Sequence, residues 1–172
     1  MSQIVAYPAQ ILREPCIPAT VGSKAARDIG DRLQMILRTD KRGVALSAPQ
    51  INESVRIFAL DTAWLNLKCF AVFVNPEVTW QSEETDVFPE GCLSFPKSVT
   101  VPVRRSKRCT ISAYSGHGAQ FTVELFGMAA RAALHECEHL NGITILDHAT
   151  PSQRSKIMKA IVAGLKMKVA KK

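Results

Sequence analysis

Two histidines and a glutamate are the residues of this sequence whose types and spacing point most directly to chemistry. They lie in HECEH, residues 135–139, which has the form H-E-x-x-H. Residues four positions apart share one face of a helix, so His135 and His139 can bind one metal ion. Glu136 lies one position further round the helix and can accept a proton from water without binding the metal. The segment therefore predicts a metal-dependent hydrolytic site.

A catalytic site of this type needs a third protein ligand. In metzincin proteases the third ligand is a histidine six residues after the second histidine, but this chain has Ile145 there. In thermolysin-like proteases the third ligand is a downstream glutamate, but no acidic residue follows Asp147 in this chain. Asp147 itself leaves an H-E-x-x-H metalloprotease open as an alternative. Upstream, Cys92 lies in EGCLS, residues 90–94, where Gly91 allows the backbone to approach a ligand closely.

Three ordered motifs together resemble those of the peptide deformylase family. They are GVALSAPQ at residues 43–50, EGCLS at 90–94 and HECEH at 135–139, in the family's order and spacing. The resemblance extends over nearly the whole chain. It implies an enzyme that removes the N-formyl group from the N-terminal methionine of newly synthesised polypeptides and releases formate. A cytoplasmic location is the default expectation. The expected partners are N-formylmethionyl nascent peptides, with no membrane and no DNA.

The resemblance also implies roles for individual residues. The implied metal ligands are Cys92, His135 and His139. They would bind one divalent metal, expected to be Fe2+, for which Zn2+, Ni2+ or Co2+ can substitute. Glu136 would accept a proton from water and return it to the departing amine. The Gln50 side-chain amide and the Leu93 backbone N–H would donate hydrogen bonds to the developing oxyanion.

The substrate is expected to lie against the first motif. Its backbone would pair in an extended conformation with residues 43–46, and the methionine side chain would enter an apolar pocket. The candidate substrate-binding residues are Gly43, Val44, Ala45, Leu46, Phe88, Gly91, Met128 and Ala132. For Phe88 and Met128, a place in the ordinary hydrophobic core is the alternative.

Four positions depart from the family's usual pattern. Ala45 replaces the second glycine of G-x-G-L-A-A-P-Q, and its methyl group could crowd the substrate or forbid a positive φ. Ser47 replaces an alanine, and Leu134 replaces the glutamine before H-E-x-x-H. Glu138 replaces an aspartate, with one of the two arginines at 104–105 as its candidate partner. These changes leave open a third hypothesis, a catalytically impaired deformylase-like protein that binds formyl peptides.

The elements that must position these residues can be predicted from apolar spacing. A helix begins after Ser23 and ends before Gly43. Apolar runs predict strands at residues 55–60, 70–74, 99–103, 109–114 and 119–124, the last two as a hairpin. One helix at 127–140 carries HECEH, and another spans 152–170. The expected fold class is α+β, with antiparallel β-sheets around the central metal-binding helix and helices toward both ends of the chain.

Composition limits the class of protein. The 172 residues are 47% hydrophobic, which excludes disorder for most of the chain, and the apolar runs are too short to span a membrane. Five cysteines, an odd number without framework spacing, follow an N-terminus that does not resemble a secretory signal. Together they favour free thiols in a reducing cytosol.

The net charge of +7 is confined to the end of the chain. Residues 151–172 contain seven basic residues and no acidic one, whereas residues 1–150 hold 15 of each. We therefore expect a deformylase catalytic domain at 1–150, extended by a basic C-terminal helix at 151–172. The resemblance implies that such a helix can dock on the ribosome. The alternative is a helix that packs on the domain and leaves its lysines in solvent.

Overall fold

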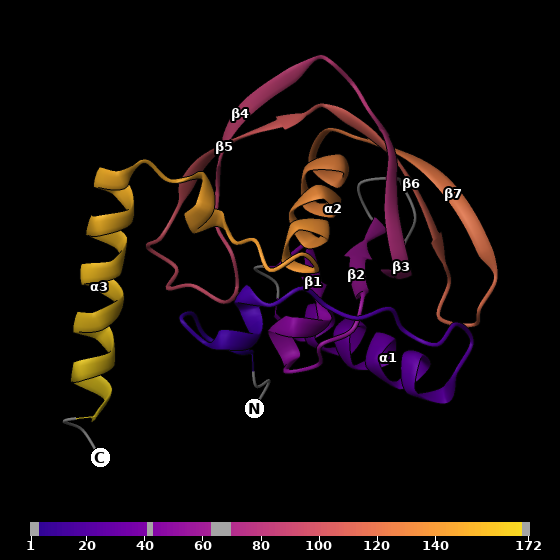
Figure 1. Ribbon diagram of the computed structural model, residues 1–172, viewed down its shortest axis with the longest axis horizontal. Helices are drawn as coiled ribbons and strands as arrows, with labels where there is room; N and C mark the ends of the chain where they lie inside the picture. Colours follow the sequence, from indigo (N-terminus) through magenta and orange to yellow (C-terminus); the bar gives the residue numbers. More distant parts are fainter. Residues whose placement is uncertain (1–3, 41–42, 63–69, 170–172) are drawn as a thin grey trace.

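The computed structural model describes residues 4–40, 43–62 and 70–169 of the chain (Figure 1). It contains α-helices (α), 3-10 helices (η) and strands (β). Their order is η1 (Gln10–Arg13), α1 (Lys24–Thr39), β1 (Ala45–Ser47), η2 (Ala48–Ile51), β2 (Ile57–Asp61), β3 (Phe70–Gln81), β4 (Thr85–Glu90), β5 (Val101–Ser106), β6 (Arg108–Tyr114), β7 (Gln120–Phe126), α2 (Gly127–His139), η4 (Ile145–His148) and α3 (Pro151–Val169). The expected α+β class is confirmed.

Two antiparallel sheets carry the fold. One has five strands in the order β1-β2-β3-β6-β7, and the other consists of β4 and β5 alone. Figure 1 shows α2 near the centre of the molecule, with β4 and β5 above it and α1 below it in this view. The central helix is the one that carries HECEH, as the sequence indicates.

Alternating strand residues divide the hydrophobic core into two layers. In β2, Phe58 and Leu60 pack on the side of α2, whereas Ile57 and Ala59 pack on the side of α1. This alternation is expected, because successive side chains of a strand point to opposite faces. Small side chains let α2 approach the sheet closely, and its alanines from residue 129 to 133 are almost completely buried. Helix α2 is therefore fixed by packing, with its histidines directed away from the sheet's apolar face.

Most predicted elements are present with small changes of boundary. Ser23 caps α1 through a 3.1 Å hydrogen bond that its Oγ accepts from the Ala26 N–H, and the predicted hairpin pairs Tyr114 with Gln120. Strand β3 continues to Gln81, well beyond the predicted 70–74. Strand β4 was not predicted, since all its residues except Glu90 are exposed and no apolar alternation marks it. Among the described residues, its one strand partner is β5.

Helix α3 lies at the edge of the molecule, beside η4 (Figure 1). Ile161 is buried and packs with Ile145 and Leu146, and Ile157 is partly buried in the same cluster. Ile161 thus packs on the domain, as the alternative to ribosome docking predicts for the apolar face of this helix, which carries Ile161 and Leu165. The side chain of Leu165 lies outside the described residues. Within the described part of the chain, none of the helices combines the length and the apolar character needed to span a membrane.

Candidate active site

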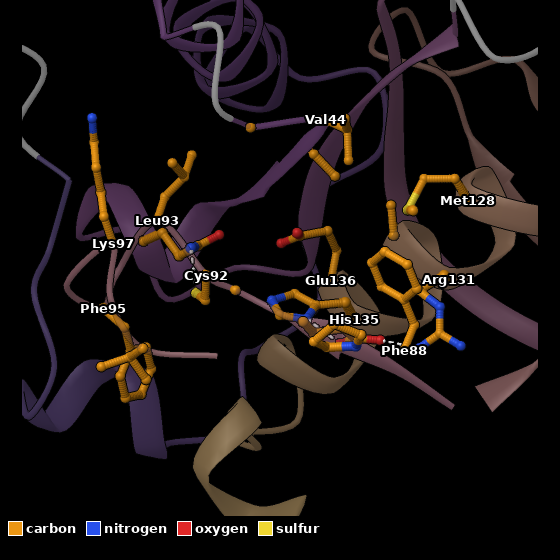
Figure 2. Close-up of a pocket in the computed structure, with 18 of the residues that line it drawn as sticks. Val44, Phe88, Cys92, Leu93, Phe95, Lys97, Met128, Arg131, His135 and Glu136 are labelled. Carbon is orange, nitrogen blue, oxygen red and sulfur yellow. Dashed lines mark hydrogen bonds and ion pairs between the residues drawn. The ribbon is translucent and has the colours of Figure 1, made fainter. Parts of the chain in front are cut away.

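Three side chains that are far apart in the sequence converge at the C-terminal end of α2. The Sγ of Cys92 lies 3.3 Å from His139 Nε2. One ligand atom from each of Cys92, His135 and His139 lies within 4.8 Å of the other two, a spacing that could hold a metal ion. Cys92 lies just after the end of β4, separated from it by Gly91. The two-stranded sheet therefore places the thiol next to the helix. Figure 2 shows Cys92, His135 and Glu136 around this position.

Glu90 orients the first histidine. Its Oε2 lies 3.0 Å from His135 Nδ1, which leaves His135 Nε2 for the ligand cluster. Arg105 Nε donates to Glu90 Oε1 at 2.7 Å, and Arg131 Nη1 donates to the same oxygen at 2.6 Å. Burial raises the pKa of Glu90, but hydrogen bonds from His135 and Arg105 outweigh it and lower the pKa to about 2. Glu90 is therefore an ionised carboxylate, which can only accept hydrogen bonds, so His135 Nδ1 carries the proton.

Glu138 is held by partners on two sides. Its Oε2 lies 2.9 Å from Arg105 Nη2 and 2.9 Å from His148 Nε2. Of the two candidate arginines, Arg105 is the partner, whereas Arg104 donates to Thr85 Oγ1 on the exposed hairpin. The side chain of Glu138 is longer than the aspartate usual at this position, and it still reaches Arg105, the arginine that also binds Glu90.

The amide of Gln50 has a fixed orientation. Its Oε1 accepts hydrogen bonds from the Ser47 N–H at 2.9 Å and from Ser47 Oγ at 3.0 Å. Its Nε2 is consequently directed at Cys92 Sγ, 3.4 Å away, and at Ser94 Oγ, 3.2 Å away. Ser47, one of the departures from the family's usual pattern, therefore takes part in positioning Gln50. The Gln50 amide therefore donates to the thiol of the ligand cluster.

Glu136 is buried beside the ligand cluster. Its Oε2 has no hydrogen-bond partner among the described residues, and neither has His139 Nδ1. Burial raises the pKa of Glu136, although the nearby His135 and Ser47 act to lower it. A buried carboxylate oxygen without a partner costs free energy, so its position calls for a bound water or substrate group.

A pocket of about 450 Å³ opens beside the cluster. Its lining includes these predicted site residues: Gly43, Val44, Ala45, Gln50, Phe88, Gly91, Cys92, Leu93, Met128, Ala132, His135 and Glu136. The side chain of Leu46 is instead completely buried on the α1 side of the sheet. In Figure 2, Phe88, Met128 and Arg131 lie on one side of the pocket, and Leu93 and Lys97 lie on the other.

Ala45 lies in β1 and has no positive φ. Its side chain is buried against the α2 side of the sheet, so the backbone conformation accepts an alanine without strain. Leu134, another departure from the usual pattern, is buried in the same cluster. The same cluster contains Cys137, as its position on the far side of the helix predicts.

Sequence reasoning missed Arg131 and Lys97, which also line the pocket. Arg131 lies among alanines, four residues before His135. A charged residue on an otherwise apolar helix face is the sequence feature that could have indicated its place at the site. Lys97 lies in an irregular segment after EGCLS, where the sequence offers no periodicity to place it.

Asp147 does not belong to the ligand cluster. It accepts hydrogen bonds from Thr144 in a capping box at the start of η4 and forms an ion pair with Arg13. The third donor beside the two histidines is the thiol of Cys92. The metalloprotease alternative, which needs Asp147 as a ligand, is therefore not favoured.

Comparison with known proteins agrees with this geometry. The model of the polypeptide deformylase family matches residues 1–155. The chain belongs to the polypeptide deformylase family. A peptide deformylase from Thermotoga maritima is 33% identical to it over 164 residues, which cover 94% of this chain and 95% of the relative. One from Pseudothermotoga lettingae is 37% identical over 134 residues, 78% of this chain and 74% of the relative.

Solved deformylase structures have the same fold. Peptide deformylase 1B of Arabidopsis thaliana superimposes with a TM-score of 0.84 at 30% identity, covering 98% of this chain and 93% of that one. The peptide deformylase of Legionella pneumophila gives a TM-score of 0.87 at 27% identity and covers 98% of both chains. Members of this family are metal-dependent hydrolases that remove N-formyl groups from nascent peptides. The chain is an enzyme of this class.

Proposed function

We propose that this deformylase acts on N-formylmethionyl peptides with Cys92, His135 and His139 as metal ligands and Glu136 as proton carrier. The observation that carries this assignment is the convergence of one thiol and two imidazoles beside a buried carboxylate oxygen with no partner among the described residues. The hydrogen-bonded Gln50 amide beside the same thiol supports an oxyanion-binding role for this side chain.

The donor set fits a divalent transition metal. A thiolate and two imidazoles suit Fe2+, Zn2+, Ni2+ and Co2+, and we propose Fe2+ as the native ion. The contact between Glu90 and His135 Nδ1 supports ligation through His135 Nε2. When bound, the metal supplies Lewis-acid chemistry, which makes water more acidic and polarises a carbonyl oxygen.

Glu136 would transfer the proton during hydrolysis. As water attacks the formyl carbon, the carboxylate accepts a proton from the water and then donates it to the nitrogen of the departing amine. The raised pKa that burial gives Glu136 favours such uptake and return. Gln50 Nε2 and the Leu93 N–H would donate hydrogen bonds to the carbonyl oxygen as negative charge develops there. The products are formate and a free N-terminal methionine.

The substrate backbone would extend β1. This strand is at the edge of the five-stranded sheet, and its one strand partner among the described residues is β2. The Asp61 N–H donates to Val44 O at 2.8 Å, so the alternate residue Ala45 directs its backbone N–H and C=O to the free edge. A peptide bound there would run beside the pocket that Val44, Phe88 and Met128 line.

Formate release measured together with metal content tests the proposal. Anaerobically metallated wild type should release formate from formyl-Met peptides. The Glu136→Gln variant should keep the metal but lose about 10²–10⁴-fold in kcat. Glu124→Gln, an exposed substitution on β7, serves as the control and should match wild type.

Three outcomes would contradict the assignment. Tight binding of formyl peptide by metallated wild type without formate release would favour the impaired binding protein. Near-normal turnover by Glu136→Gln would remove the proton-transfer role. Internal cleavage of unformylated peptides that Asp147→Ala abolishes, but Cys92→Ala does not, would restore the metalloprotease alternative.

We further propose that α3, as a basic extension of the catalytic domain, contacts ribosomal RNA. Lys156 and Lys159 are exposed on α3, while Ile157 and Ile161 of the same helix pack on the domain. A helix anchored by its apolar face presents its lysines to phosphate groups in a salt-dependent manner. A cytoplasmic location, which the sequence indicates, is consistent with this role and stays a prediction.

Charge reversal tests the ribosome contact without removing the helix. The double variant Lys156→Glu and Lys159→Glu should co-sediment less with ribosomes at low salt and hydrolyse short formyl peptides at the wild-type rate. Lys24→Glu, an exposed substitution on α1, is the matched control. Equal co-sedimentation of all three proteins would exclude α3 as the contact.

A further inference from the structure

Arg131 joins helix α2 to strands β4 and β5. It projects from α2 four residues before His135, and its side chain is only 7% exposed. Its Nη1 donates to Glu90 Oε1 at 2.6 Å and to Val103 O at 3.0 Å, and its Nη2 donates to the carboxylate of Asp86. Its guanidinium carbon also lies 5.7 Å from the centre of the Phe88 ring, and Figure 2 shows the two side chains together.

All the acidic and aromatic partners of Arg131 named above come from one face of β4. Asp86, Phe88 and Glu90 are alternate residues of this strand, so their side chains point to the same side. Strand β4 pairs with β5 in a two-stranded sheet, and in the part of the chain that the structure describes it does not pair with a strand of the larger sheet. Arg131 therefore fastens this face of β4 to the helix that carries the candidate metal ligands.

We propose that Asp86 is a positioning residue that acts through Arg131 to hold Phe88 as a wall of the methionine pocket. This inference rests on the proposed function, because it concerns recognition of the first side chain of the formyl peptide. Asp86 does not line the pocket, so it has no direct contact with a substrate there.

The electrostatics explain how Asp86 can act at a distance. The Arg131 side chain is almost fully buried, whereas the Asp86 side chain is 52% exposed. The Asp86 carboxylate binds Nη2 of the guanidinium from the solvent side and so fixes this edge of the group. A guanidinium held beside an aromatic ring attracts it through the negative face of the ring. In Asp86→Ala, the contacts of Arg131 Nη1 with Glu90 and Val103 remain, so the ligand cluster is preserved. Nη2 keeps only its 3.3 Å hydrogen bond to the backbone carbonyl of residue 86, so the guanidinium beside Phe88 loses its charged partner and is held less firmly.

Steady-state kinetics on two substrates test this role. In Asp86→Ala, we expect KM for a formyl-Met tripeptide to rise about threefold to tenfold while kcat stays within about twofold. The ratio of kcat/KM for formyl-Met over the matched formyl-Ala tripeptide should fall by a similar factor, because the apolar wall contacts only the longer side chain. Asp86→Asn keeps an acceptor oxygen and should give an intermediate ratio.

Glu84→Ala is the matched control. Glu84 is an exposed acid beside the same hairpin and pairs with Lys107 at 2.7 Å, away from the pocket. This variant should keep the wild-type ratio. A fall in the ratio as large as that of Asp86→Ala would indicate general loosening of the hairpin and would overturn the specific role.

A double-mutant cycle with Phe88→Ala decides whether Asp86 acts through Phe88. Once Phe88 is removed, adding Asp86→Ala should change the formyl-Met to formyl-Ala ratio little further. If Asp86→Ala lowers the formyl-Met to formyl-Ala ratio by the same factor in the wild type and in Phe88→Ala, the proposal is overturned. Absence of formate release by the wild type would overturn the proposed function and this inference together, whereas normal release with an unchanged ratio in Asp86→Ala would overturn the role of Asp86 alone.

Discussion

Glu90 and His135 are in direct contact, with Glu90 Oε2 3.0 Å from His135 Nδ1. The same carboxylate binds Arg105 and Arg131, so its negative charge is balanced while it orients the imidazole. Burial opposes the charged form of His135, but its hydrogen bonds with Cys92 and Glu90 outweigh burial and raise its pKa to about 10. The contact with Glu90 also fixes the ring so that Nε2 is directed at the ligand cluster, which links this buried network to metal binding.

Replacing Glu90 should weaken metal binding. We expect Glu90→Gln to lower metal affinity by about 10–100-fold, since the amide supplies a weaker acceptor to His135 Nδ1. Competition with a chromophoric chelator measures the change. Glu84→Gln removes an exposed carboxylate and should leave affinity unchanged. Wild-type affinity in folded Glu90→Gln would show that the contact does not tune the site.

Glu90 should also make the fold sensitive to acid. Its folded-state pKa of about 2 lies below the ordinary value of 4.5, so its contribution to stability is present above about pH 4.5 and is lost as pH falls toward 2. The difference corresponds to about 3 kcal/mol in the free energy of unfolding. Denaturant titrations of metal-free protein at neutral pH and near pH 3 measure it. Glu90→Gln should lose less stability over this interval, and an equal loss would contradict the prediction.

Two core thiols should resist alkylation in the folded protein. Burial raises the pKa of Cys109 to about 11 and that of Cys137 to about 12, so neither forms appreciable thiolate near neutral pH. Mass spectrometry after iodoacetamide treatment should find both unmodified in native protein and both modified after denaturation. Rapid native labelling of Cys137 would mean that α2 opens readily.

Gly142 fixes the turn after α2, the helix that carries the candidate metal ligands. Its φ is +73°, and a Cβ there would lie 2.6 Å from Arg13 O. We expect Gly142→Ala to lower the free energy of unfolding by about 2–4 kcal/mol, because a backbone atom cannot move aside cheaply. Gly116→Ala is the control, since its Cβ would make only ordinary contacts, 3.9 Å from Val72. Similar losses in both variants, measured by denaturant titration, would contradict this explanation.

Features that depend on local periodicity can be predicted from the sequence alone. The i and i+4 spacing of His135 and His139 requires a shared helix face, and Ser23 marks the start of α1. The three ordered motifs were enough to indicate the family. Strand β4 could not be predicted from the sequence, because its residues are mostly exposed and do not alternate between apolar and polar side chains.

The folded structure shows which distant side chains meet. It selected Arg105 over Arg104 as the partner of Glu138, excluded Asp147 from the ligand cluster and placed Arg131 between Asp86 and Phe88. These contacts join residues from separate strands and helices, and their geometry depends on how α2 packs between the two sheets. Spacing along the chain carries no information about such packing, because one helix face can meet many different neighbours.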